Sequence, residues 1–181
     1  MFKTSLTARE RLARVRANIQ RFGYLPRLPH GEDNGKSVAI CGFGPSLAET
    51  WREIKKADVV ASTSGAHDFL ISKGIIPTYH IECDPREHKT NFIRNSHPAV
   101  TYLLNSQCHP SMFEALLPGR NVTMWHGFTD DDVDNQLALI GNLVGPWNSQ
   151  PIRVLAGGTN VGMRAVPVMR EQGYVGFELH G

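Results

Sequence analysis

Short apolar runs alternate along the chain with longer stretches in which apolar residues recur every three or four positions. The short runs predict buried β-strands over residues 38–41, 58–62, 78–83, 100–104, 122–125, 153–156 and 175–179. The stretches between them predict helices that begin at 45–46 and that cover 66–73, 87–94, 110–117, 131–143 and 159–172. Repeated strand–helix units of this length predict an α/β fold, with a Rossmann-like, mainly parallel, doubly wound sheet and helices on both faces.

A further helix is predicted before the first strand. The pattern Thr7-x-x-Glu10 is a capping box, which starts a helix that runs to Phe22. One face of this helix is apolar, and five arginines make another face basic: Arg9, Arg11, Arg14, Arg16 and Arg21. The basic face is either an arm over an acidic ligand or anionic surface, or the solvated side of a helix packed on the domain edge. Proline and glycine breakers follow, so we expect an N-terminal helix and linker over 1–35 and a nucleotide-binding domain over 36–181.

The composition is that of a globular domain with one core. The 181 residues are 41% hydrophobic and 20% charged. A net charge of +2 gives no argument for nucleic acid, and neither a membrane-spanning run nor a signal peptide is visible. The three cysteines share no Cys-x-x-Cys spacing, which argues against zinc and against disulfides, and favours a reducing cytoplasm.

The first predicted strand is followed by a glycine turn, Gly42-Phe43-Gly44-Pro45-Ser46, that leads into a helix. This geometry binds phosphate, because glycines let the backbone approach the ligand and the N–H groups of the helix start face the anion. The third glycine of the dinucleotide fingerprint is missing, and so is the Gly-Lys-Ser/Thr of a P-loop. The turn therefore predicts a phosphate site without naming the nucleotide, and the alternative is an ordinary turn of an α/β protein.

In a doubly wound sheet the ligand lies beyond the carboxyl ends of the strands, where this sequence places small and polar residues. Asp84 follows the third strand, and a carboxylate beside a phosphate loop can hold Mg²⁺. The alternative is that Asp84 caps the next helix, with Pro85 at its first position. Thr63, Ser64 and His67 follow the second strand, where a nucleotide ribose or base usually lies. His67 is either a ligand contact or a surface residue of the next helix.

The later strand ends supply further candidates. Asn105 and His126 follow the fourth and fifth strands, and His126 can donate to a phosphate, although a lone histidine is more often structural. A second glycine turn, Gly157-Gly158-Thr159-Asn160, leads into the last helix. It offers a second anion site, and it is also a tight turn with Thr159 as the N-cap. The acidic residues near position 131 fit a helix start better than a metal cluster.

Five motifs occur in a fixed order: Gly42-Phe-Gly-Pro-Ser-Leu47, Val59-Val-Ala-Ser-Thr-Ser-Gly-Ala-His67, Leu70-Ile-Ser-Lys-Gly-Ile-Ile-Pro77, Glu82-Cys-Asp-Pro85 and Gly157-Gly-Thr-Asn-Val-Gly162. The series resembles the 6-hydroxymethylpterin diphosphokinase (MptE-like) family, from about residue 35 to residue 181. That family includes bacterial motility accessory factors and shares its first motif with sialyltransferases that use CMP-sugars. The resemblance includes Asp84, and it implies that the loop over 157–160 helps to hold the nucleotide.

The resemblance implies a nucleotide-binding transferase that moves diphosphate from ATP to a hydroxymethylpterin-like acceptor with Mg²⁺. The turn over 42–46 would hold phosphates and Asp84 the metal. No general base is evident, which phosphoryl transfer tolerates. The expected partners are a nucleotide and a small-molecule acceptor, with a homo-oligomer left open.

Two alternatives stay open. One is a glycosyltransferase that uses a nucleotide-activated sugar, for which His126 is the candidate base. The other is a truncated, non-catalytic nucleotide-binding protein. This second alternative arises because the resembling proteins continue after the last strand with a polar motif, whereas this sequence stops at Gly181.

Overall fold

The computed structural model describes residues 6–127, 140–141, 153–158 and 160–181. In this part of the chain, one sheet holds seven strands in the order β6-β5-β4-β3-β2-β1-β7. Their bounds are β1 Ser37–Cys41, β2 Val59–Thr63, β3 Tyr79–Glu82, β4 Thr101–Asn105, β5 Asn121–Gly127, β6 Val154–Leu155 and β7 Gly176–His180. Every pairing is parallel. The α/β fold predicted from the alternating pattern is therefore confirmed.

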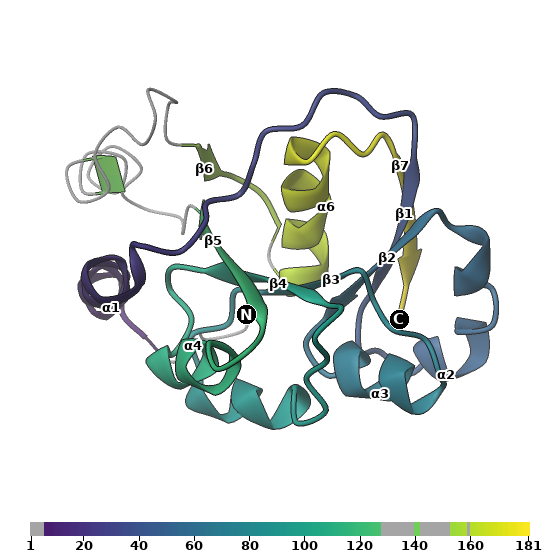
Figure 1. Cartoon of the computed structure of the whole chain (residues 1–181), viewed down its shortest axis with the longest axis horizontal. Coiled ribbons are helices and arrows are strands. Elements are labelled where there is room, and N and C mark those ends of the chain that lie inside the picture. The colour runs from purple at the N-terminus through teal and green to yellow at the C-terminus, as the bar shows by residue number, and fades with distance from the viewer. Residues whose placement is uncertain (1–5, 128–139, 142–152, 159) are drawn as a thin grey trace.

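Helices lie on both faces of the sheet (Figure 1). Helix α6 covers one face and contacts β1, β2 and β3, while α2, α3 and α4 lie on the other. The bounds are α1 Ala8–Phe22, α2 Leu47–Thr50, α3 Ala66–Ser72, α4 Pro110–Leu116, α6 Val161–Glu171, and the 3₁₀-helices η1 Ile54–Lys56 and η2 Glu87–Phe92. Because the central strands are covered on both sides, β1 and β4 are buried at nearly every position and read as continuous apolar runs.

The strand order places β7, the last strand, beside β1, the first. Cys41 pairs with His180 at the carboxyl end of the two strands. The chain winds outward from β1 to β6 and then returns through α6 to β7, so the strand order reverses at β1. In open parallel sheets the ligand lies in the crevice at such a reversal. The loop after β1 therefore occupies the position where a ligand site is expected.

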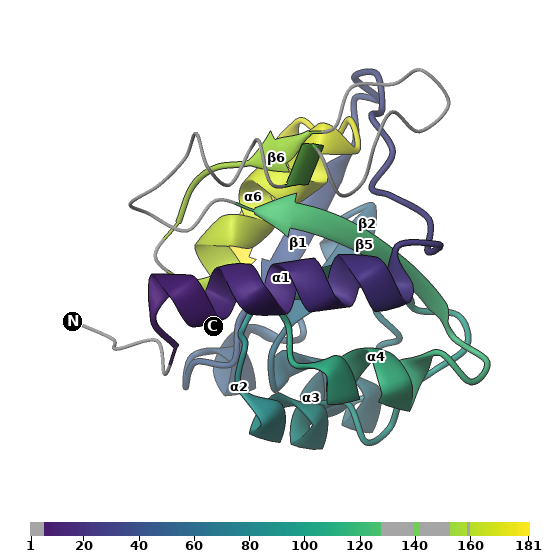
Figure 2. The same ribbon diagram turned by 90° about the vertical axis from the view of Figure 1, so that its left-hand side faces the viewer.

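Helix α1 lies along the side of the sheet, near β5 and α4 (Figure 2). The predicted capping box is present: the Thr7 side chain accepts from the Glu10 backbone N–H, and the Glu10 carboxylate accepts from the Thr7 N–H at 2.7 Å. The apolar face of α1 is buried, and Phe22 stacks on Phe113 with ring centroids 4.8 Å apart. The helix therefore packs on the domain edge, as one of the two interpretations predicted.

The predicted linker over 23–36 is tied to the domain by backbone hydrogen bonds. The Met124 N–H of β5 donates to the Pro26 carbonyl at 2.8 Å, and the Leu28 N–H donates back to Met124. Farther along, the Gly31 N–H donates to the Glu171 carbonyl at the end of α6, again at 2.8 Å. The segment thus crosses from the β5 edge to the end of α6 as an ordered connection.

The helix expected from positions 45–46 through Ile54 is broken into two short pieces. α2 ends at Thr50, and the 3₁₀-helix η1 follows. Leu47 and Ile54 are both buried. Neither piece has a side-chain N-cap, so burial of these apolar residues, rather than helical propagation, sets the local structure.

Three other predicted helices differ from the structure or lie outside its described residues. The segment 87–94 forms the 3₁₀-helix η2 rather than an α-helix. The helix expected over 131–143 lies outside the described residues except for 140–141, and the acidic residues at its start lie outside them too. Helix α6 begins later than predicted, because its N-cap is Asn160, whose side chain accepts a backbone hydrogen bond from the first turn.

Candidate functional site at the carboxyl ends of the strands

Strand β3 ends in a buried carboxylate. Glu82 has no exposed surface, and its Oε1 accepts hydrogen bonds from the backbone N–H groups of Cys83, at 2.9 Å, and Asp84, at 3.0 Å. Among the described residues, Oε2 has no hydrogen-bond partner. Burial raises the pKa of Glu82, against the lowering effect of the nearby Lys89 ammonium. The Glu82 side chain thus shapes the turn that presents Asp84.

Asp84 lies in this turn and is held by two cations. Arg86 Nε donates to Oδ1 at 2.9 Å and to Oδ2 at 3.0 Å, and Lys89 Nζ lies 3.4 Å from Oδ2. Burial alone would raise the pKa of Asp84, but the hydrogen bonds from Arg86 and the charges of both cations outweigh it and lower the pKa. The backbone N–H of Arg86 also donates to Asp84, but Arg86 itself is the N-cap of η2. The predicted capping role of Asp84 therefore applies to the turn before the helix.

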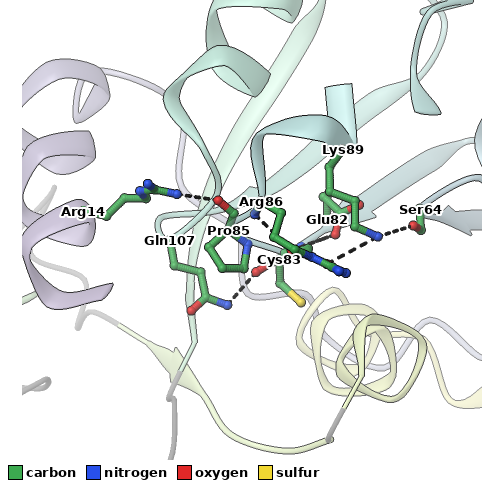
Figure 3. Close-up of polar contacts among 9 residues, drawn as sticks. Arg14, Ser64, Glu82, Cys83, Pro85, Arg86, Lys89 and Gln107 are labelled. Carbon is green, nitrogen blue, oxygen red and sulfur yellow. Dashed lines mark hydrogen bonds and ion pairs between the residues drawn. The ribbon is translucent and has the colours of Figure 1, made fainter. Parts of the chain in front are cut away.

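Lys89 connects this cluster to the end of β2 (Figure 3). Only 8% of Lys89 is exposed, and its Nζ donates to Ser64 Oγ at 2.8 Å. Ser64 has a φ of +50°, a conformation uncommon for any residue except glycine. Such backbone strain persists where surrounding contacts impose it, and it is concentrated at functional sites. One buried ammonium thus joins the carboxyl ends of β2 and β3.

Helix α1 supports the loops that follow β3 and β4. Arg14 donates to the Pro85 carbonyl (Figure 3). Asn18, which is 1% exposed, donates through Nδ2 to the carbonyls of Ser106 and Cys108, both at 2.8 Å. The N-terminal helix is therefore part of the structure that positions the strand ends.

The glycine turn after β1 packs against the carboxyl end of β7. The Gly42 N–H donates to the His180 carbonyl at 2.7 Å, and a Cβ on Gly44 would lie 2.5 Å from the carbonyl carbon of Gly181. Close approach of these two chain segments therefore requires glycine at position 44 whether or not a ligand binds. Ser46 is exposed, and its hydroxyl does not cap α2. With four residues, α2 adds little dipole, so the phosphate role of the turn stays a prediction that depends on its backbone and Ser46.

Of the residues predicted after β2, Ser64 alone joins the Asp84 cluster. Thr63 is 1% exposed and donates its hydroxyl to a backbone carbonyl of β1 at 3.2 Å. His67 is fully buried, with its ring nitrogens 2.7 Å from Asp68 Oδ1 and 3.0 Å from the Tyr102 hydroxyl. Burial lowers the pKa of His67, against the opposing effect of Asp68. Of the two alternatives left open for His67, the surface residue is wrong, because α3 turns this side chain into the core.

Asn105 and His126 are also interior residues. Asn105 closes β4, and its Oδ1 accepts from the Gln107 N–H at 2.9 Å, while its Nδ2 has no partner among the described residues. His126 lies within β5 rather than after it, with Nδ1 3.0 Å from Ser106 Oγ. Burial, and to a lesser degree the charge of Arg27, lowers the pKa of His126 to about 4. A buried neutral ring of this kind fits the structural interpretation of His126.

The second glycine turn has the backbone that its sequence predicts. Gly157 and Gly158 have φ angles of +118° and +74°, a region that favours glycine. Asn160 takes the N-cap position predicted for Thr159, which itself lies outside the described residues. Arg164 Nε donates to the Gly158 carbonyl at 3.1 Å and fixes the turn to α6. The anion-binding role of this turn stays a prediction.

The side-chain oxygens at and beside Asp84 are not arranged as ligands for the predicted Mg²⁺. This ion takes near-octahedral oxygen ligands, usually one or two carboxylates together with phosphates and water. Both Asp84 oxygens already accept from Arg86, and the neighbouring Glu82 carboxylate is turned toward backbone N–H groups. Within the described residues, no group of three or more His, Cys, Asp or Glu side chains is placed to hold a metal. In this arrangement the cations beside Asp84 are Arg86 and Lys89.

The sequence patterns did not single out Lys89, and they placed Gln107 among the polar residues after the fourth strand without assigning it a role. Gln107 donates through Nε2 to the Cys83 carbonyl at 2.6 Å, and so links the β4 and β3 ends (Figure 3). Lys89 lies in a segment with an ordinary polar pattern, and its burial results from the way η2 folds against the strand ends. One available signal was Glu82, because an acidic residue at the end of an apolar strand requires a compensating cation nearby.

The parallel sheet and the polar carboxyl edge define a doubly wound α/β protein of the class that binds ligands beyond the strand ends. The chain belongs to the 6-hydroxymethylpterin diphosphokinase MptE-like family, whose model matches residues 12–177. Comparison with curated proteins gives no match. None of the helices in the described part has the length and apolar character of a membrane span.

Among solved structures, the fold is similar to that of the MAf glycosyltransferase from Magnetospirillum magneticum AMB-1, with a TM-score of 0.67. The sequences are 18% identical, so the likeness concerns the fold. The match covers 94% of this chain and 27% of that chain. The protein therefore spans about a quarter of the length of that relative.

Proposed function

We propose that the protein is a nucleotide-dependent transferase that moves diphosphate from ATP to a hydroxymethylpterin-like acceptor. The observation that carries this proposal is the position of Lys89, a buried ammonium between Ser64 and Asp84 at the ends of β2 and β3. A cation fixed at the strand ends suits a phosphate group, because it attracts the anion without having to reorganise first. Arg86 adds a second cation beside it. The family to which the chain belongs supports the choice of diphosphate as the transferred group.

In this reaction the hydroxyl oxygen of the acceptor attacks the β-phosphorus of ATP. The bond from that phosphorus to the oxygen bridging the α- and β-phosphates breaks, AMP leaves with the electron pair, and the hydroxyl proton passes to solvent. Such transfer is catalysed mainly by positioning and charge stabilisation. Lys89 and Arg86 would stabilise charge on the transferred oxygens, and Asp84 would hold the two cations in place.

The likeness to a glycosyltransferase fold supports a second candidate, transfer from a nucleotide-activated sugar. The same two cations would then stabilise the phosphate of the leaving nucleotide. The two candidates differ in their donor, which is ATP for one and a sugar nucleotide for the other. A non-catalytic nucleotide-binding protein would bind a nucleotide without turnover.

The test is a calorimetric titration of the purified protein with ATP, GTP, CMP and UDP-sugars, with and without Mg²⁺ in the buffer. It is followed by an assay of AMP formation from ATP with 6-hydroxymethylpterin as acceptor. The proposal expects ATP binding and AMP formed in equal amount to diphosphorylated acceptor. Binding of a CMP- or UDP-sugar in preference to ATP, with sugar release, would replace it by the second candidate. Binding without any turnover would leave the non-catalytic alternative.

A matched pair of lysine variants tests the observation behind the proposal. Lys89→Met keeps the length of the buried side chain and removes its charge, and we expect it to weaken ATP binding about tenfold or more. Lys56→Met removes the charge of an exposed lysine in η1. It should leave ATP binding unchanged. Equal affinities of the two variants, with both proteins folded, would contradict a phosphate role for Lys89.

A further inference from the structure

Phe43, in the turn after β1, is a large apolar side chain that is held in place and yet exposed. Its exposed fraction is 58%. The ring lies directly over Gly65: a Cβ on that glycine would come 2.5 Å from Phe43 Cδ1 and 2.8 Å from Cγ. Gly65 has an ordinary φ of −65°, so its backbone conformation does not require glycine. A Cβ at position 65 would instead force the Phe43 ring to move.

The same ring borders the cation cluster. Phe43 contacts Phe92 of η2, with ring centroids 6.2 Å apart, and Phe92 in turn lies under the Lys89 ammonium, 5.1 Å from its centroid. Gly65 directly follows Ser64, the hydrogen-bond partner of Lys89. An exposed aromatic ring and a buried cation are therefore both placed at the carboxyl end of β2, and each of them contacts Phe92. A ligand with a planar ring and an anionic group matches both features.

We propose that Phe43 is a stacking platform for the planar heteroaromatic ring of the ligand whose phosphate is bound by Lys89. The inference rests on the proposed function for its phosphate, and adds the residue that recognises the ring. Two rings have this chemistry, the nucleobase of the donor and the ring system of a pterin-like acceptor. Stacking on an aromatic side chain does not depend on hydrogen bonds, so Phe43 contributes affinity for a flat ring rather than a choice between bases.

Three variants and three probes test the proposal by calorimetry. Phe43→Leu keeps an apolar side chain and removes the aromatic face, Phe43→Trp keeps an aromatic face, and Gly65→Ala displaces the ring without altering Phe43. The probes are ATP, inorganic tripolyphosphate, and 6-hydroxymethylpterin. Ile76→Ala removes an exposed apolar side chain elsewhere and serves as the control. Thermal unfolding checks that each variant is folded.

Phe43→Leu and Gly65→Ala should weaken binding of a ring-containing probe about fivefold or more, and Phe43→Trp should restore it. Tripolyphosphate, which has no ring, should bind all variants within about twofold of the parent protein. A loss confined to ATP assigns the platform to the nucleobase, and a loss confined to 6-hydroxymethylpterin assigns it to the acceptor.

Unchanged affinity of Phe43→Leu for both ring-containing probes overturns the inference. The inference is also overturned if the parent protein binds neither ATP nor 6-hydroxymethylpterin. Failure of the proposed function looks different, because the parent protein then binds neither ATP nor tripolyphosphate. In that case Phe43 is judged on 6-hydroxymethylpterin alone.

Discussion

Lys89 donates a 2.8 Å hydrogen bond to Ser64 and so joins the 3₁₀-helix η2 to the end of β2. The same ammonium lies 3.4 Å from Asp84 at the end of β3. Two neighbouring strand ends therefore share one buried charge. Ser64 and Asp84, the two partners of the Lys89 ammonium, can be substituted separately, so that the contribution of each contact can be measured.

Ser64→Ala and Ser64→Gly should differ in stability although both lose the same hydrogen bond. Ser64→Ala leaves the buried ammonium without its hydroxyl partner and keeps the left-handed backbone, so we expect the free energy of unfolding to fall by about 1–3 kcal/mol. Ser64→Gly relieves the backbone strain, which should return about 1 kcal/mol. Urea unfolding measures both values. Equal losses would show that the positive φ carries no strain.

Asp84→Asn distinguishes a carboxylate that holds cations from one that holds a metal. The change removes a negative charge beside Arg86 and Lys89 with little change of shape. If these cations bind phosphate, affinity for tripolyphosphate in EDTA should rise severalfold, because the carboxylate no longer competes for them. A metal ligand would instead give weaker ATP binding in Mg²⁺ and an unchanged titration in EDTA. Asp33→Asn, at an exposed carboxylate paired with Arg170, is the control.

The protein should lose stability as the pH falls from about 6.5 toward 4. The pKa of His126 is lowered to about 4 by burial, whereas the unfolded chain takes up this proton near pH 6.5. Between these values the unfolded state binds more protons, so acidification favours it. The stabilising effect is complete above pH 6.5 and is lost as the pH falls through the folded pKa. Burial lowers the pKa values of His67 and His80 too, which adds to the loss.

His126→Gln isolates one contribution to this pH dependence. Removing the titrating ring should flatten the decline in the free energy of unfolding by about 3 kcal/mol between pH 6.5 and 4. Chemical denaturation at a series of pH values gives the two curves. Identical slopes for the variant and the parent protein would contradict the lowered pKa.

Asn18→Asp should destabilise the protein more than Asn18→Ala at neutral pH. The aspartate would place a buried carboxylate oxygen against the carbonyls of Ser106 and Cys108, where the amide now donates two hydrogen bonds. We expect losses of about 3 kcal/mol or more for Asp and about 1–3 kcal/mol for Ala. Acidification should narrow the gap, since a protonated carboxyl can donate one hydrogen bond. A gap that stays constant from pH 7 to 4 would count against this geometry.

Two glycine-to-alanine changes should have opposite signs. Gly74 ends α3 with a φ of +74°, and its N–H and that of Ile75 donate to Ile71 and Leu70 in a Schellman motif. A Cβ there meets nothing within 4 Å, so Gly74→Ala should cost about 1 kcal/mol through backbone strain alone. Gly162→Ala, in α6, should stabilise by about 0.5 kcal/mol. Thermal unfolding of both variants checks the signs.

The sequence predicted the fold well because the signals for it are local. Apolar runs and glycine or proline breakers marked the strands, and the capping box at Thr7 forms as predicted. Helix boundaries were predicted less well. The broken helix after β1 shows why. Leu47 and Ile54 are both buried, and two short helical pieces bury them without one continuous helix between them.

The candidate site was harder to predict because its contacts join distant segments. Asp84 and Ser64 were found from their places after strands, but Lys89 was not, since only tertiary packing buries it between them. His67 and His126 illustrate a second difficulty, because burial cannot be read from their positions in the sequence. Both are candidate site residues by type and by position near a strand end. However, α3 and β5 turn their side chains into the interior, where burial lowers their pKa values. A residue type near a strand end indicates a site only when the side chain faces outward.

The pairing of β1 with β7 has a consequence for biosynthesis. The turn over 42–46 directly follows the first strand, yet its shape depends on His180 and Gly181, which the ribosome adds long after the turn has been made. Strands β1 to β5 can pair with their sequence neighbours as they emerge, but β1 keeps one open edge until β7 arrives. Such a long-range closure is slow in folding. We therefore expect nascent chains stalled before residue 176 to expose an unpaired β1 edge that recruits chaperones.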